Sequence, residues 1–169
     1  MAGREKSALS AVQQIITIRP FSPGVKFPAM KYEPKANAFC IPVRVYYEDT
    51  DAAGVVYYAN YLKFFERCRT EWVRTLGYDQ SELARDHAIV FVVGSVSLQY
   101  LKPARLDDLL SVGLEVEKLG RAQVVFRQHV RRGDEELATA TVQIVCVDPH
   151  KMKSTAIPDW LRQKLESLQ

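Results

Sequence analysis

The sequence predicts an α+β protein in which a curved, five-stranded antiparallel sheet wraps around one long central helix. The first observation is the order of the periodic segments: one strand-like run, one long amphipathic helix, then four more strand-like runs. The second is that short turns join the last four runs, which favours antiparallel neighbours. A sheet and a helix with one apolar face each can bury those faces against one another.

The first strand and the long helix are the most regular elements. Alternation of apolar residues predicts a strand over about 40–47. The helix is expected at about 58–76 and should end at Gly77, because glycine readily adopts a positive φ angle. Its apolar face holds Tyr61, Phe65, Cys68, Trp72 and Leu76. Its solvent-facing side is expected to hold Asn60, Lys63, Arg67, Thr70, Glu71 and Arg74.

The rest of the chain supplies a short helix, four strands and a last helix. The short helix is expected at about 79–86, with Ser81 as a candidate N-terminal cap. A final amphipathic helix, 158–168, begins with Pro158, a residue suited to the first helical turn. The four strands are expected at 89–100, 109–118, 122–131 and 136–147. Residues 39–169 are therefore expected to form one domain.

Residues 1–38 differ from the rest of the chain in composition. They hold six basic and two acidic residues, whereas the remainder holds 17 basic and 18 acidic residues. Four prolines and Gly24 interrupt the segment, so regular structure is not expected there. We interpret it as a disordered leader, or as sequence upstream of a true start at Met30. A tail that folds over the functional site is a third interpretation.

Composition argues against several classes of protein. The domain has no dense stripe of Lys and Arg, so nucleic-acid binding is not expected. The three cysteines are widely spaced without a CxxC pair, which argues against a zinc site or a disulfide framework. No apolar run reaches the roughly 20 residues of a transmembrane helix, and the start lacks a clean secretory signal. We expect a cytoplasmic protein.

The segment 43–66 gives the strongest indication of function. It holds three carboxylates within four residues, then a glycine, then a cluster of tyrosines where the long helix begins. These residues are Glu48, Asp49, Asp51, Gly54, Tyr57, Tyr58 and Tyr61. The first amides of a helix have no partner within the helix and lie at the positive end of its dipole. A carboxylate beside them can attack a carbonyl whose oxygen they polarise, so the segment predicts an active site.

Asp51 is the first candidate for catalysis among these carboxylates. Aspartate is common in turns for purely structural reasons. Small residues and Gly54 follow Asp51, however, and they permit a ligand to approach the backbone closely. Asp49 is expected to bind turn amides instead, and Glu48 is expected to pair with Arg44 or to be solvated.

Two charged residues outside this cluster are further candidates for the site. Glu66 either forms a surface pair with Arg69 or orients a water molecule. Arg121 follows Gly120 at a tight turn and is a candidate to bind phosphates of a handle such as coenzyme A. No histidine has metal-ligand spacing, and no GxSxG elbow, P-loop or GxGxxG occurs. Neither a metal nor a bound cofactor is expected.

The run 47–61 resembles the signature of the hotdog-fold thioesterases of the 4-hydroxybenzoyl-CoA type. It is most similar to the Tol–Pal-associated acyl-CoA thioesterase branch, which the runs 103–108 and 145–149 also resemble. The similarity spans residues 40 to about 160. It implies a hotdog fold and a homodimer or homotetramer with active sites at subunit interfaces.

The resemblance also implies roles for individual residues. Asp51 matches the catalytic aspartate of the family, and Tyr58 matches the residue whose backbone N–H polarises the thioester carbonyl. Many Tol–Pal-associated members have histidine at the position of Tyr58, so this chain lacks any role of that imidazole. Phe91, Val92 and Val93 match the second strand of the family, which lines the acyl site.

We therefore predict an acyl-CoA thioesterase in which Asp51 is the nucleophile or the general base. The Tyr58 amide would stabilise the oxyanion, and Tyr61 is a candidate for the acyl pocket, although aromatic residues at helical spacing are more often core. A dehydratase or hydratase is disfavoured because 51–66 contains no histidine. A non-catalytic acyl-thioester-binding or regulatory protein is the main alternative. Acyl carrier protein is a further candidate partner.

Overall fold

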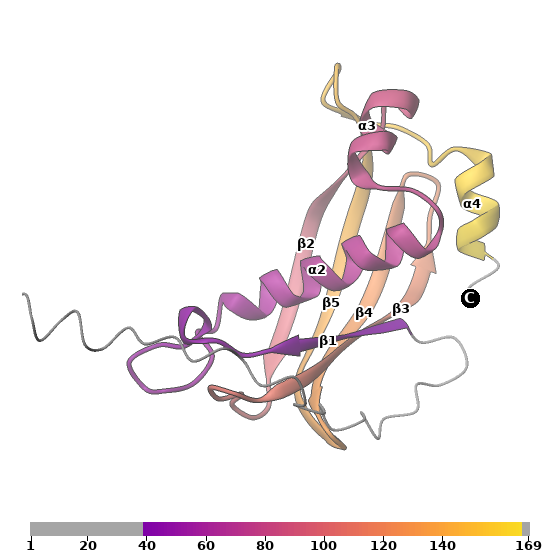
Figure 1. The fold of residues 1–169 in the computed structure, drawn as a ribbon. Coiled ribbons are helices and arrows are strands. Elements are labelled where there is room, and N and C mark those ends of the chain that lie inside the picture. Colours follow the sequence, from indigo (N-terminus) through magenta and orange to yellow (C-terminus); the bar gives the residue numbers. More distant parts are fainter. Residues whose placement is uncertain (1–38, 167–169) are drawn as a thin grey trace, which may run out of the picture. The chain divides into compact units, whose positions relative to one another are not determined.

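Helix α2 crosses one face of a single antiparallel sheet, and apolar side chains fill the space between them (Figure 1). The coordinates are a computed structural model that describes residues 39–166. The expectations for residues 1–38 and for the last residues of the C-terminal helix lie outside the described residues.

The elements follow the predicted order along the chain. They are β1 (Phe39–Arg44), the short 3₁₀ helix η1 (Tyr47–Asp49), α2 (Asn60–Thr75), α3 (Gln80–His87), β2 (Val90–Tyr100), β3 (Leu109–Leu119), β4 (Gln123–Arg132), β5 (Glu135–Asp148), β6 (Lys153–Ser154) and α4 (Asp159–Glu166).

The strand order in the sheet is β1-β3-β4-β5-β2, and the two-residue β6 pairs with the end of β5. Every pairing between neighbouring strands is antiparallel. The predicted α+β class, with a curved five-stranded sheet around one long helix, is confirmed (Figure 1). Strand β6 was not predicted because two residues leave no periodic pattern.

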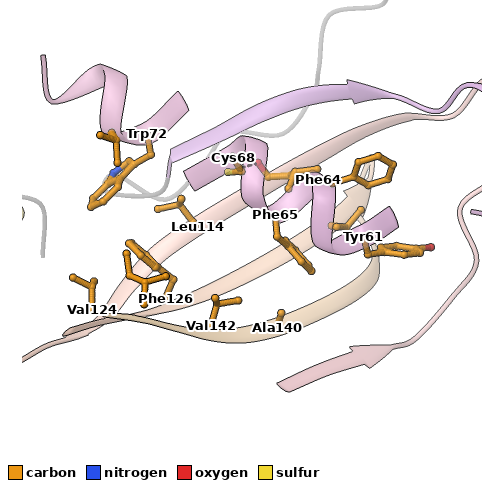
Figure 2. Close-up of a cluster of buried hydrophobic side chains, with 14 of the residues drawn as sticks. Tyr61, Phe64, Phe65, Cys68, Trp72, Leu114, Val124, Phe126, Ala140 and Val142 are labelled. Atoms are coloured by element: carbon orange, nitrogen blue, oxygen red, sulfur yellow. Dashed lines mark hydrogen bonds between the residues drawn. The ribbon is translucent and has the colours of Figure 1, made fainter. Parts of the chain in front are cut away.

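The core lies between α2 and the inner face of the sheet (Figure 2). Phe64, Phe65 and Cys68 are fully buried on the helix. The Trp72 ring meets Phe126 of β4 edge to face, with ring centroids 5.2 Å apart. The predicted buried face of the helix is therefore confirmed at Tyr61, Phe65, Cys68 and Trp72.

Two predictions at helix ends are wrong. Asn60 is buried rather than solvent-facing, because its side-chain amide turns back toward the preceding loop and donates to Asp49 O at 3.1 Å. Asp79, not Ser81, caps α3, since its carboxylate accepts the Glu82 amide at 2.8 Å. Ser81 instead donates its hydroxyl proton to Asp79.

The first strand ends at Arg44, three residues earlier than expected. Beyond it, the chain is fixed by the turn that joins β2 to β3. Val45 N–H donates to Asp108 O at 3.0 Å, and Val56 N–H donates to Ala104 O at 2.8 Å. An isolated bridge also joins Val55 to Arg105. These bonds hold the segment 45–59 against the sheet and position it at the start of α2.

Strand β2 lies at an edge of the sheet, with β5 on one side and no strand on the other within residues 39–166. Several of its apolar residues are exposed, among them Val93 (51%) and Val96 (41%). None of the helices in the same range combines the length and apolar character that crossing a membrane requires.

Candidate active site

The loop between β1 and α2 is organised around a buried carboxylate. Asp49 is only 4% exposed, and its Oδ2 accepts the Tyr46 amide at 2.9 Å. Its backbone oxygen accepts the Tyr57 amide at 2.8 Å as well as the Asn60 side chain. The predicted structural role of Asp49 is confirmed, because these bonds join the 3₁₀ turn to the first turn of α2.

Asp51 occupies the tip of a tight loop and is exposed. The Asp51 amide donates to Val55 O at 2.9 Å. The amide of Gly54, which has a φ of +72°, donates to Asp51 O at 2.9 Å. The Ala53 amide donates to Asp51 Oδ1 at 2.8 Å. Within the described part of the chain, Oδ2 accepts no hydrogen bond and the carboxylate forms no ion pair. The bond to Oδ1 therefore orients the Asp51 carboxylate, and Oδ2 is available to react with a substrate or with water.

The N-terminus of α2 has unused hydrogen-bond donors. No side chain caps the helix at Ala59, and its first turn contains no acidic residue. Among residues 39–166, no acceptor binds the backbone amides of Tyr58 and Ala59. Since helix N-termini carry a partial positive charge, this end of α2 is suited to bind an oxygen that becomes negative.

Four tyrosines surround this helix end. The Tyr57 and Tyr58 rings lie with centroids 4.6 Å apart, and the Tyr100 ring meets Tyr61 edge to face at 5.4 Å. A hydrogen bond with the Tyr58 side chain raises the pKa of Tyr57, and the nearby Asp51 charge adds a smaller upward contribution. The Tyr100 hydroxyl donates to Tyr58 O at 2.9 Å. The cluster therefore links the Asp51 loop to the last residue of β2.

Tyr61 itself is core. Its side chain is 3% exposed, and its hydroxyl accepts the Ala104 amide at 3.1 Å. Burial raises the pKa of Tyr61, which keeps its hydroxyl protonated. Tyr61 therefore supports the β2–β3 turn, and its role in the acyl pocket stays a prediction.

Glu66 and Arg69 do not form the surface ion pair that their spacing suggests. Glu66 Oε1 accepts the Thr70 hydroxyl at 2.7 Å, and Arg69 turns inward to donate to Gln128 Oε1 at 2.7 Å. Burial lowers the pKa of Arg69, partly offset by the charge of Glu66. The fully buried Gln128, which no sequence motif marks, also donates to Phe65 O at 3.1 Å.

A cavity of about 100 Å³ opens beside this group. It brings together three of the predicted substrate-binding residues, Glu66, Phe91 and Val93. Its other lining residues are Arg69, Thr70, Trp72, Val73, Gln80, Phe126 and Ile144. Val92, on the same strand, alternates to the opposite face of the sheet.

Asp51, Tyr58 and Arg121 do not line this cavity. Arg121 follows the end of β3, near Ile157, whose amide donates to Arg121 O at 2.9 Å. The Asp51 loop instead lies at the other end of the same strands, next to Arg105. A single chain therefore presents the predicted site residues in three separate places.

The described residues form no site suited to bind a metal ion, and two of their thiols are unsuited to act as nucleophiles. No group of three or more His, Cys, Asp or Glu side chains in residues 39–166 is arranged to hold a metal ion. Burial raises the pKa of the Cys68 thiol to about 12 and that of Cys146 to about 11, so both thiols stay protonated.

Comparison with known proteins gives one consistent family. Residues 53–139 match the model of the thioesterase superfamily. The acyl-CoA thioesterase YbgC of Haemophilus influenzae is 50% identical over 122 residues, which cover 72% of this chain and 90% of that protein. The acyl-CoA thioester hydrolase YbgC of Escherichia coli is 46% identical over 118 residues, or 69% of this chain and 87% of that protein.

A solved structure agrees with these relatives. The crystal structure of a probable thioesterase from Bartonella henselae superposes with a TM-score of 0.69 at 34% identity, covering 72% of this chain and 99% of that chain. These matches confirm the resemblance seen in the sequence and the hotdog fold that it implies.

Proposed function

We propose that this chain, which belongs to the thioesterase superfamily, hydrolyses an acyl-coenzyme A thioester with Asp51 as the reacting carboxylate. It is a thioester hydrolase, so the alternative of a non-catalytic acyl-thioester-binding protein is set aside. The observation that supports Asp51 most directly is its geometry: one carboxylate oxygen is fixed by the Ala53 amide and the other is unbound within residues 39–166.

The N-terminus of α2 supplies the oxyanion site in this proposal. The thioester oxygen binds the Tyr58 amide, which has no acceptor among the described residues and lies at the uncapped positive end of the helix. One such donor typically contributes about 3 kcal/mol to acyl transfer. Because the donor is a backbone group, tyrosine in place of histidine leaves it intact.

Two routes are compatible with this arrangement. In the first, Asp51 Oδ2 attacks the carbonyl carbon, the C–S bond breaks, and water then hydrolyses the mixed anhydride. In the second, Asp51 takes a proton from water, the hydroxide attacks the carbonyl carbon, and the proton passes to the leaving thiolate. Both routes yield the free acid and coenzyme A.

We propose that a second copy of the chain completes the site. The edge strand β2 supports such pairing of two chains, since its apolar side chains Val93 and Val96 are exposed to solvent in a single chain. Tyr58 and Glu66 are eight residues apart on or beside α2, or about 12 Å along a helix axis. In this proposal the cavity at Glu66, Phe91 and Val93 of one chain serves as the acyl subsite for the Asp51 loop of the other chain.

Arg121 remains a candidate ligand of the coenzyme A phosphates in such an assembly. It is exposed, and its guanidinium has no ion pair among the described residues. Acyl carrier protein, which would present the same acyl thioester, is retained as an alternative carrier.

The central test is Asp51→Asn. Asparagine keeps an oxygen that can accept the Ala53 amide, so the loop should retain its shape while the charge is lost. We expect kcat for acyl-CoA hydrolysis to fall by about 10²–10⁴-fold, measured as free thiol released. Glu48→Gln is the matched control, because Glu48 is an exposed carboxylate three residues away. Similar rates for Asp51→Asn and the wild type would refute the assignment.

The acyl group is identified by a hydrolysis panel. Butyryl-, octanoyl-, palmitoyl- and 4-hydroxybenzoyl-CoA differ in length and aromaticity. A cavity of about 100 Å³ should favour the butyryl or 4-hydroxybenzoyl ester over palmitoyl. A preference for palmitoyl-CoA would show that the acyl group binds elsewhere than in this cavity. The assignment of Asp51 would not be affected.

A further inference from the structure

The carbonyl of Tyr58 is held by a side chain from a distant strand. The Leu62 amide, which would donate to Tyr58 O in a regular α-helix, donates to Ala59 O instead, at 3.1 Å. The Tyr58 carbonyl therefore accepts no hydrogen bond from the first turn of the helix. The Tyr100 hydroxyl takes the place of this backbone donor and donates to Tyr58 O at 2.9 Å. The two residues are 42 positions apart in the sequence.

Tyr100 is itself fixed from two sides. It is the last residue of β2, in register with Ala138 of β5. Its ring meets Tyr61 edge to face at 5.4 Å and Tyr58 at 6.5 Å. Because Tyr61 is buried and bonded to the Ala104 amide, its ring is a rigid support. The Tyr100 hydroxyl therefore reaches Tyr58 from the end of a paired strand, and the Tyr100 ring packs on the buried Tyr61 side chain.

The chemistry follows from the planarity of the peptide bond. The Tyr58 carbonyl and the Ala59 N–H belong to one rigid plane and point in opposite directions. A donor that fixes the oxygen therefore also fixes the direction of the N–H. It also polarises the peptide, which strengthens that N–H as a donor. Neither the Ala59 amide nor the Tyr58 amide has an acceptor within residues 39–166.

We propose that Tyr100 is a positioning residue for thioester hydrolysis. Its hydroxyl holds the Tyr58–Ala59 peptide so that the Ala59 amide joins the Tyr58 amide as a second donor to the thioester oxygen. This inference rests on the function proposed above. It assigns Tyr100 no contact with the substrate.

The test is Tyr100→Phe, which removes the hydroxyl and keeps the ring that meets Tyr58 and Tyr61. We expect kcat to fall about three- to tenfold, the effect of one ordinary hydrogen bond, while KM changes less than about twofold. Tyr78→Phe is the matched control. It deletes a hydroxyl that has no hydrogen bond in the described structure, and Tyr78 packs against Trp160, far from the helix start.

A spectroscopic measurement separates positioning from a general structural effect. The best substrate of the four-ester panel, labelled with ¹³C at its carbonyl, is bound to Asp51→Asn and to the Asp51→Asn, Tyr100→Phe double variant. We expect its carbonyl stretch to move to lower frequency on binding Asp51→Asn. The shift should be smaller in the double variant, because the second donor is misaligned.

Each outcome has a distinct meaning. An unchanged kcat in Tyr100→Phe, or equal carbonyl shifts in the two Asp51 backgrounds, overturns the role of Tyr100. A lower melting temperature with altered KM but equal carbonyl shifts shows a merely structural tyrosine and also overturns it. Full activity of Asp51→Asn refutes the function proposed for Asp51, whatever Tyr100 does.

Discussion

His129 shows how packing on the sheet controls the ionisation of a single residue. It is 8% exposed on β4, and its ring lies directly over Gly113 of β3. A Cβ atom at Gly113 would stand 2.4 Å from ring atoms of His129, so only glycine accommodates the ring in this position. Burial lowers the pKa of His129 below its usual 6.5, and the charge of Arg131 lowers it further.

This shift predicts a dependence of stability on pH. Below about pH 6.5 the unfolded chain binds a proton at His129 while the folded chain does not, so the free energy of unfolding should fall as pH decreases. The fall should continue down to the lowered pKa of the folded state and then stop. His129→Gln should reduce this slope in urea titrations between pH 5 and 8. Equal slopes in the variant and the wild type would contradict the prediction; His150→Gln, at an exposed residue, is the control.

Single residues also show what the sequence reveals about the site. The structural role of Asp49 could be predicted, because aspartate near a turn commonly accepts backbone amides. Asn60 could not, because a helical wheel assigns a face by angle and ignores a side chain that folds back on the preceding loop. The sequence predicts only that Tyr100 lies in a strand, since its bond to Tyr58 joins segments that no local pattern connects.

At the scale of elements, the junction between η1 and α2 determines where Asp51 lies. The Asn60 side chain donates to Asp49 O at 3.1 Å and to Glu48 O at 3.4 Å, and Asn60 is 5% exposed. The helix start and the 3₁₀ turn are thereby joined on either side of the Asp51 loop. Loosening this junction should affect both stability and catalysis.

Asn60→Ala tests that junction. We expect a loss of about 1–3 kcal/mol in the free energy of unfolding, because two backbone carbonyls lose a buried donor. We also expect kcat to fall, because the Asp51 loop would no longer be fixed relative to the helix amides. Lys63→Ala, one turn along the same helix and exposed, should change neither quantity appreciably. Denaturant titration and steady-state kinetics check both; unchanged stability in Asn60→Ala would show that the bonds contribute little.

The elements with strong periodicity were predictable, and short or irregular ones were not. The helix and the four later strands are predictable to within a few residues, because each repeats its pattern over at least eight residues. Strand β1 stops at Arg44 because the chain turns to bond with Asp108, a contact 63 residues away. The 3₁₀ turn η1 depends on the Asp49 carboxylate and so has no periodic pattern.

At the scale of the whole molecule, the apolar edge formed by β2 is the expected place of self-association. Val96→Asp puts a charge on this edge, and we expect it to reduce the mass measured by light scattering and to reduce activity with it. Met152→Asp is the control, since Met152 is 74% exposed on the loop between β5 and β6. A wild-type mass for Val96→Asp would place the interface elsewhere.

The burial of two of the three cysteines affects how the enzyme can be assayed. Coenzyme A release is followed with thiol-reactive chromogens, which react with thiolates. Cys68 and Cys146 are buried and remain protonated at neutral pH, so they should react slowly, and only the half-buried Cys40 should contribute a background signal. Colour in excess of one equivalent per chain therefore reports turnover.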